Sequence, residues 1–159
     1  MGIIISCFKG CGATYFTNLY GSKVKVLDKR GELKNDDVDE ILNVVGNYDI
    51  VFISSDEKTR DLFNDRNIDY DVFYPSAERR GEFIENMVRK RVQPKEIQSL
   101  DKDFYKMVEE LDNDAQENCY KHKMAEQGHF IGNDTVIMQY VDSLDSNNTN
   151  TEGGSNDNS

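Results

Sequence analysis

The chain has 159 residues, of which 37% are hydrophobic and 31% charged, and its formal net charge is −11. This length suits one domain with a full core. The negative charge excludes a general affinity for DNA or RNA, because phosphate backbones repel such a surface. The sequence contains no apolar run of membrane-spanning length, and its three cysteines form no disulfide framework. We therefore expect a cytoplasmic protein with no signal peptide and no membrane partner.

The first half of the chain predicts strands that alternate with helices. Apolar or alternating runs predict strands at 2–6, 23–27, 49–53 and 70–74. Between them, residues 14–19 predict a short helix, and residues 36–45 carry apolar side chains at helical spacing. A third helix is expected to run to about Asn67, with Ser55 or Asp56 as its cap. Strand-helix alternation of this kind predicts a parallel sheet flanked by helices.

The second half is predicted to be mostly helical. Residues 76–92 form a charged helix with an apolar side, and Pro94 breaks this helix or opens the next. Further helices are expected at 95–111, 116–126 and 135–144, with a turn or a short strand at 128–132. Residues 145–159 are almost entirely Ser, Asn, Asp, Thr and Gly, which predicts a disordered polar tail after a domain that spans 1–144.

The segment between the first strand and the first helix partly matches a phosphate-binding loop. The full pattern is G-x-x-x-x-G-K-[ST], and here Cys7 replaces its first glycine while Ala13 replaces its lysine. Gly10, Gly12 and Thr14 fit a loop whose amides surround a phosphate at a helix N-terminus. The expected nucleotide-binding residues are Lys9, Gly10, Cys11, Gly12, Ala13, Thr14 and Tyr15, with the Thr14 hydroxyl on Mg²⁺. The alternative is a glycine-rich turn without a ligand.

Residues 3–16, 23–28 and 70–84 together resemble phage-encoded nucleoside and deoxynucleoside monophosphate kinases of the P-loop superfamily. The resemblance implies a three-layer α/β sandwich of the P-loop NTPase type, with about four or five mostly parallel strands. It implies ATP and Mg²⁺ as cofactors and an NMP or dNMP as phosphoryl acceptor. The family normally has lysine where this chain has Ala13, which is either a natural loss or an engineered knockout.

The same resemblance implies three catalytic residues. Asp28 would meet the acceptor or the hydration shell of Mg²⁺, and Arg79 with Arg80 would neutralise the transferred phosphoryl group. Each has a structural alternative: Asp28 as a strand-end cap, and the arginines as partners of Glu78 or Glu82 on a helix.

Other residues are candidates for binding phosphate, magnesium or zinc. Lys9 either reaches a phosphate or is a solvated loop lysine, and Asp56 is a helix cap or a magnesium-binding acid. Cys119, His122 and His129 have an incomplete spacing for zinc.

Two functions follow from these residues. The first is a (deoxy)nucleoside monophosphate kinase impaired by Ala13, and the second is a catalytically inactive module that binds a nucleotide or a protein partner. A P-loop hydrolase or switch ranks lower, because the sequence has no clear Walker B run that ends in an acid and no switch-like motif.

Overall fold

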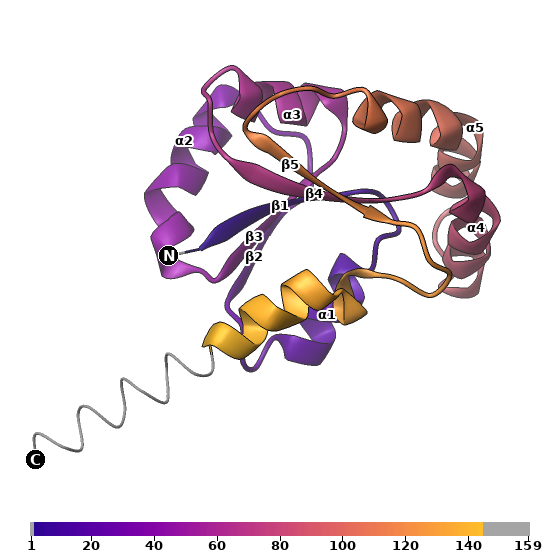
Figure 1. Cartoon of the computed structure of the whole chain (residues 1–159), viewed down its shortest axis with the longest axis horizontal. Helices are drawn as coiled ribbons and strands as arrows, with labels where there is room; N and C mark the ends of the chain where they lie inside the picture. Colours follow the sequence, from indigo (N-terminus) through magenta and orange to yellow (C-terminus); the bar gives the residue numbers. More distant parts are fainter. Residues whose placement is uncertain (1, 145–159) are drawn as a thin grey trace, which may run out of the picture.

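A computed structural model describes residues 2–144, which form five parallel strands in the order β2-β3-β1-β4-β5. The predicted α/β fold with a central parallel sheet is confirmed (Figure 1). The strands are β1 (Ile3–Cys7), β2 (Val26–Lys29), β3 (Ile50–Ser54), β4 (Tyr70–Pro75) and β5 (Cys119–Met124). Because all five run in one direction, their carboxyl ends meet at one edge, where ligands bind in open α/β sheets.

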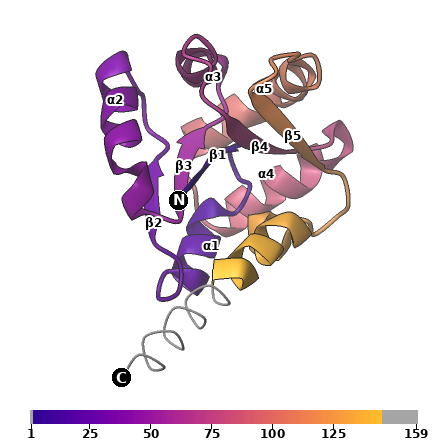
Figure 2. The ribbon, with the colours of Figure 1, turned by 60° about the vertical axis from the view of Figure 1, so that its left-hand side comes forward.

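Helices cover both faces of the sheet. They are α1 (Ala13–Tyr20), α2 (Asn35–Val44), α3 (Glu57–Asn64), α4 (Arg80–Arg89) and α5 (Pro94–Asp112), with single 3₁₀ turns at Val45–Asn47, Ala77–Arg79 and Ile131–Asn133. Residues 135–144 are also helical. Figure 2 shows α2 and α3 on one face, with α1 and residues 135–144 together on the other. This is the three-layer arrangement predicted for the domain; residues 145–159, predicted to be a disordered tail, lie outside the described residues.

The prediction of a helix at 116–126 was wrong, because Cys119–Met124 forms the edge strand β5. It pairs in parallel with β4, from Tyr70 opposite Cys119 to Pro75 opposite Met124. Only the two ends of β5 are buried, while the lysines and histidine between them face partly outward. An edge strand with so little buried surface lacks the alternating apolar pattern by which strands are found, and its pairing with β4 is a tertiary effect.

Three phenylalanines hold the loop after β1 against α4 and α5. Phe8, Phe83 and Phe104 are fully buried, with ring centroids 5.2 to 6.0 Å apart in edge-to-face contacts. Such pairs add about 0.5–1.5 kcal/mol each beyond the area they bury. The packing of Phe8 on Phe83 and Phe104 therefore fixes the position of the loop. Within residues 2–144, no helix combines the length and apolarity that a membrane span needs.

Candidate functional site

The loop between β1 and α1 requires glycine at two positions. Gly10 and Gly12 have φ of +87° and +93°, in the left-handed region that side chains rarely adopt. A Cβ atom would also lie 3.1 Å from the Phe83 ring at Gly10, and 3.3 Å from the Cβ of Phe130 at Gly12. Only glycine therefore allows this loop shape, which is the reason the sequence pattern could be read.

The amides at the start of α1 are open. Gly12 is the N-cap and has no side chain, so no side-chain hydrogen bond caps this end of α1 in the part of the chain that the structure describes. Among the hydrogen bonds of residues 2–144, none is donated by the backbone amides of Gly12, Ala13 or Thr14. Cys11 differs, because its amide bonds to Phe8 and its carbonyl accepts from Ile131. Unpartnered amides at a helix N-terminus favour an anion through their partial positive charge.

A cavity of about 270 Å³, the loop cavity, lies over these amides and carries excess positive charge. Its lining contains Lys9, Arg30 and Lys90, with Glu96 as the single acid. The chain as a whole has a net charge of −11, so this balance is opposite to that of the molecule. A local excess of cations attracts an anionic ligand to one place on an otherwise repulsive surface.

Arg30 was not predicted, although it dominates the polar contacts at the loop. Its Nη2 donates to Thr14 Oγ1 at 2.9 Å and to Asp28 Oδ2 at 2.7 Å, and its Nε donates to Asp28 Oδ1 at 2.9 Å. The structure thereby brings the predicted residues Asp28 and Thr14 together through a third. The hydrogen bond from Arg30 holds the pKa of Asp28 below its ordinary value, so this carboxylate stays charged at neutral pH.

Some of the remaining loop residues are buried, and others line the loop cavity or are exposed. Ala13 and Cys11 are buried, and burial raises the pKa of the Cys7 thiol, so it adds no negative charge beside the loop. Lys9 lies 4.0 Å from Glu96, is 45% exposed and lines the loop cavity, so its contact with a phosphate stays a prediction. Tyr15 is exposed on the first turn of α1 and lies close to Gly132.

Two further cavities adjoin the loop cavity. One of about 340 Å³, the aromatic cavity, contains Phe130 and Asn133 and shares Tyr15 and Lys90 with it. The other, about 390 Å³, lies at the strand ends; it contains Ser54, Ser55 and Asp56 and shares Lys9, Gly10, Arg30 and Glu96. A groove therefore runs from an aromatic end, across the loop, to the carboxyl ends of β1 and β3.

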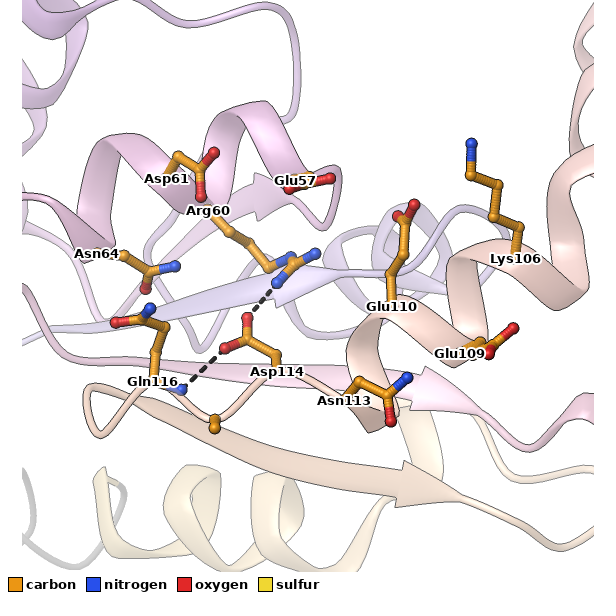
Figure 3. Close-up of a pocket in the computed structure, with 11 residues that line it drawn as sticks. Glu57, Arg60, Asp61, Asn64, Lys106, Glu109, Glu110, Asn113, Asp114 and Gln116 are labelled. Carbon is orange, nitrogen blue, oxygen red and sulfur yellow. Dashed lines mark hydrogen bonds and ion pairs between the residues drawn. The ribbon is translucent and has the colours of Figure 1, made fainter.

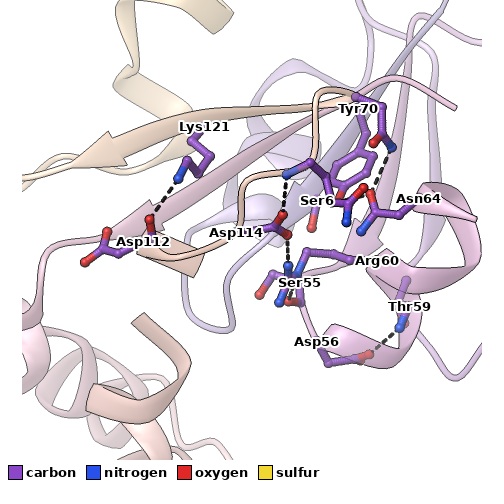
Figure 4. Close-up of polar contacts among 12 residues, drawn as sticks. Ser6, Ser55, Asp56, Thr59, Arg60, Asn64, Tyr70, Asp112, Asp114 and Lys121 are labelled. Atoms are coloured by element: carbon purple, nitrogen blue, oxygen red, sulfur yellow. Dashed lines mark hydrogen bonds and ion pairs between the residues drawn. The ribbon is translucent and has the colours of Figure 1, made fainter. Parts of the chain in front are cut away.

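Asp56 lies in the strand-end cavity as the N-cap of α3. Its carboxylate accepts from the Thr59 amide at 2.7 Å (Figure 4). It also accepts from Ser54 Oγ at 2.6 Å. Burial alone would raise the pKa of Asp56, but the bonds from Ser54 and Thr59 outweigh it and hold that pKa below its ordinary value. The predicted helix cap is thus confirmed, and the carboxylate still borders the groove.

Arg79, predicted to be catalytic, is held in the core instead of lining these cavities. Its Nε donates to Glu82 at 2.7 Å and its Nη1 donates to the carbonyls of Met124 and His129. The guanidinium lies 5.0 Å from the ring centre of Phe83 and 4.8 Å from that of Phe130. The alternative pairing with Glu82 is the arrangement observed. The Nη2 of Arg79 is buried without a hydrogen-bond partner among the described residues, but Arg79 lines none of the three cavities at the loop, so a role in phosphate binding stays a prediction.

Arg80 points toward α5. It pairs with the carboxylate of Asp101, donates from Nε to the Asp101 carbonyl at 3.3 Å, and lies 5.5 Å from the ring centre of Tyr105. Neither predicted arginine reaches the loop in this structure. The resemblance to the kinases implied their role, but their contacts depend on tertiary packing that the local sequence does not encode.

A larger cavity away from the loop has the opposite charge. It has about 520 Å³, and its lining carries five acids against two cations (Figure 3). At its base Arg60 pairs with Asp114, both nearly buried, and Arg60 Nε donates to the Ser55 carbonyl at 2.9 Å. Phosphate would be repelled here, so the smaller loop cavity is the better candidate despite its size.

The three residues weighed as zinc ligands lie in separate environments. His122 pairs with Asp71 at 2.8 Å and stacks on Phe73, while His129 pairs with Asp134 at 2.7 Å. Cys119 is buried at the start of β5. In the part of the chain that the structure describes, no three His, Cys, Asp or Glu side chains gather as a metal site would require.

Magnesium held jointly with a nucleotide is a different case, because Mg²⁺ needs few protein ligands when phosphates supply the rest. The hydroxyl oxygen of Thr14 has the right chemistry, whereas both Asp28 oxygens already accept hydrogen bonds from the Arg30 guanidinium and are not available to the ion. No protein-family model matches this sequence, and no curated protein matches it. The kinase resemblance therefore depends on the residues themselves and on the fold.

Proposed function

We propose that this chain binds a nucleoside triphosphate at the loop and belongs functionally with the (deoxy)nucleoside monophosphate kinases, with turnover reduced by Ala13. The observation that carries the proposal is the cation-lined loop cavity over the open amides of α1, at the carboxyl edge of a parallel sheet. Phosphates bind where amide dipoles and cations converge, and here both occur in an acidic molecule.

The groove gives each part of a nucleotide a place. Triphosphate oxygens would lie on the amides of Gly12, Ala13 and Thr14, next to Lys9 and Arg30. The aromatic cavity, with Tyr15 and Phe130, suits the flat base of the donor. The strand-end cavity leaves room for the phosphate of an acceptor nucleotide. Donor and acceptor would then meet over the loop, as positioning for phosphoryl transfer requires.

The reaction would move one phosphoryl group. A phosphate oxygen of the NMP or dNMP forms a bond to the γ-phosphorus of ATP, and the bond from that phosphorus to the bridging oxygen breaks, which releases ADP. Magnesium, when bound, neutralises charge on the phosphate oxygens. Thr14 is the residue that would hold it through its hydroxyl oxygen, while both Asp28 oxygens accept hydrogen bonds from Arg30. We place this activity in the cytoplasm, consistent with three free cysteines.

Restoring the missing charge tests the kinase proposal. The Ala13→Lys variant should raise phosphoryl transfer to at least one NMP or dNMP, because a charged stabiliser of the transition state typically contributes roughly 10²- to 10³-fold. The assay measures ADP formation against all common ribo- and deoxyribonucleoside monophosphates, with Lys29→Ala as a control cation change outside the cavities. No gain with any acceptor would refute the kinase function.

A second function is favoured by the positions of Arg79 and Arg80. Both arginines are engaged with Glu82 or Asp101 away from the loop, which leaves the transferring phosphoryl group without them. This arrangement fits a nucleotide-binding module without catalysis, with the nucleotide or a protein as its partner. Calorimetry separates the two: tight ATP binding with no turnover, even for Ala13→Lys, would identify the module.

A further inference from the structure

The loop lacks a cation of its own at the position that matters most. Ala13 is the residue that replaces the usual lysine, and it is 1% exposed, with a side chain that carries no charge. Backbone amides remain, but they supply only partial charges to a ligand that bears several full negative charges. If this loop binds a triphosphate, another side chain must offset that charge.

Arg30 reaches the loop from the end of β2, although β3 lies between β2 and β1 in the sheet. It follows β2, and its Nη2 donates to the hydroxyl of Thr14, the residue next to Ala13. Arg30 lines both the loop cavity and the strand-end cavity. Its guanidinium therefore lies beside the first turn of α1, where a phosphate on the open amides would be.

Asp28 holds this guanidinium in place and leaves one of its nitrogens without a partner among the described residues. Two of the Arg30 nitrogens, Nε and Nη2, are used by Asp28 and Thr14. The third, Nη1, makes no hydrogen bond to any residue between 2 and 144, and the side chain is 31% exposed. An arginine fixed on one edge and open on the other is preorganised for a phosphate oxygen, since a planar fork loses little freedom on binding.

The other two cations at the loop are less suited. Lys9 faces Glu96 at 4.0 Å, and its side chain is 45% exposed. Lys90 lines the loop and aromatic cavities but not the strand-end cavity. Only Arg30 both contacts the first turn of α1 and borders the region where donor and acceptor phosphates would meet.

We propose that Arg30 supplies the positive charge that the loop lacks at Ala13, so that an arginine anchored by Asp28 binds the terminal phosphates of a nucleoside triphosphate. This inference rests on the proposed nucleotide-binding function and assigns its main cation. It also explains how the loop could retain affinity with alanine in place of lysine: the charge comes from β2 rather than from α1.

Calorimetric titration with ATP and with inorganic tripolyphosphate tests the assignment. The variants Arg30→Ala and Arg30→Gln should weaken binding of both probes by about 10- to 100-fold, the usual effect of losing a charged hydrogen-bond partner. The Arg30→Lys variant should recover part of the affinity. Arg66→Ala is a matched control, because Arg66 also pairs with one aspartate and is 34% exposed, and it should leave both affinities unchanged.

A double variant identifies where Arg30 acts. If Arg30 substitutes for the missing lysine, Ala13→Lys should restore most of the lost affinity in the Arg30→Ala background and add little to the unaltered chain. An equal gain in both backgrounds would mean that Arg30 acts elsewhere, for example on the acceptor, and would overturn the inference. Unchanged binding in Arg30→Ala and Arg30→Gln would overturn it as well.

Two further outcomes distinguish a failure of this inference from a failure of the proposed nucleotide-binding function. If the unaltered chain binds neither ATP nor tripolyphosphate, the nucleotide-binding function itself fails, and this assignment fails with it. Circular dichroism should show a cooperative thermal transition for every variant. If Arg30→Gln loses that transition although glutamine keeps a hydrogen-bond donor, Arg30 serves the fold rather than a ligand, and the inference is wrong.

Discussion

Replacing Arg79 distinguishes a structural arginine from a catalytic one. In the Arg79→Ala variant, Glu82 loses its charged partner and the His129 carbonyl loses its donor, while the Met124 carbonyl keeps the Ser76 amide as its one remaining donor. Glu82 is 19% exposed and keeps its hydrogen bond from the Gly128 amide. The free-energy cost of losing the ion pair is therefore at the lower end of the range for buried pairs, about 3 kcal/mol. The orphaned His129 carbonyl adds about 1 kcal/mol, and the Met124 carbonyl, which keeps the Ser76 amide, adds less.

The expected loss of stability is therefore about 3–5 kcal/mol, a large share of the roughly 5–15 kcal/mol that stabilises a typical domain. For a chain of this length it corresponds to a fall of roughly 6–20 °C in the melting temperature. Urea unfolding followed by circular dichroism measures the free energy directly. The matched control is Arg80→Ala, whose pair with Asp101 is partly exposed and worth about 1 kcal/mol or less.

A contrary result has a clear form. If Arg79→Ala unfolds at the same urea concentration as the unaltered chain, the buried contacts of Arg79 do not stabilise the fold. A selective loss of phosphoryl transfer in that stable variant would restore the catalytic role that the resemblance implies, and the arrangement described here would then be one conformation among several.

Three more changes have defined outcomes. Gly12→Ala should cost about 1–3 kcal/mol in unfolding free energy, because φ is +93° there, and should weaken ATP binding in calorimetry; unchanged affinity would contradict the loop geometry. Asp56→Ala should lower the free energy of unfolding by about 1 kcal/mol, since the Thr59 amide loses its cap, and a neutral result in urea would contradict it. Arg79 holds the pKa of Glu82 below its ordinary value, so the stability from this pair is present at neutral pH and is lost as pH falls below about 4.3 toward the depressed pKa. Glu82→Gln should make unfolding free energy less dependent on pH in that window, and an unchanged dependence would argue against the pair.

The sequence was sufficient for the central fold because its signals there are local. Ile3–Cys7 and Ile50–Ser54 are continuous apolar runs, as expected for strands buried on both faces, and both were predicted within a residue or two. Gly10 and Gly12 marked the loop because only glycine fits its backbone. Where consecutive residues determine burial and backbone geometry, a single sequence is enough to predict the structure.

Prediction failed where the determining contact lies far away in sequence. The strand β5 depends on the free edge of β4, which is about fifty residues earlier. In the sequence, Arg30 is one charged residue in a polar stretch. Its place beside the loop follows from its hydrogen bond to Thr14, which is distant in sequence. A basic residue two positions after the strand-end Asp28 is the one local signal that could have pointed to it.

Arg79 shows the opposite failure. Its place after Tyr74 and Pro75 fitted a pattern carried over from the kinases, but the pattern gives no information on burial. The structure places its guanidinium against the rings of Phe83 and Phe130, which stack on each other, and Phe130 comes from a segment some fifty residues later in the chain. A charged residue packed against two such rings is fixed by tertiary packing, so its role could not be decided from neighbouring residues.

The central claim is that a triphosphate binds on the amides of the β1–α1 loop. Two-dimensional amide NMR during titration with ATP tests it most directly, because each backbone N–H reports its own surroundings. We expect the largest shifts at Gly10, Gly12, Ala13 and Thr14, with Glu57 and Asn113, in the acidic cavity, unchanged. Shifts confined to that acidic cavity, or no shifts at millimolar ATP, would contradict the account.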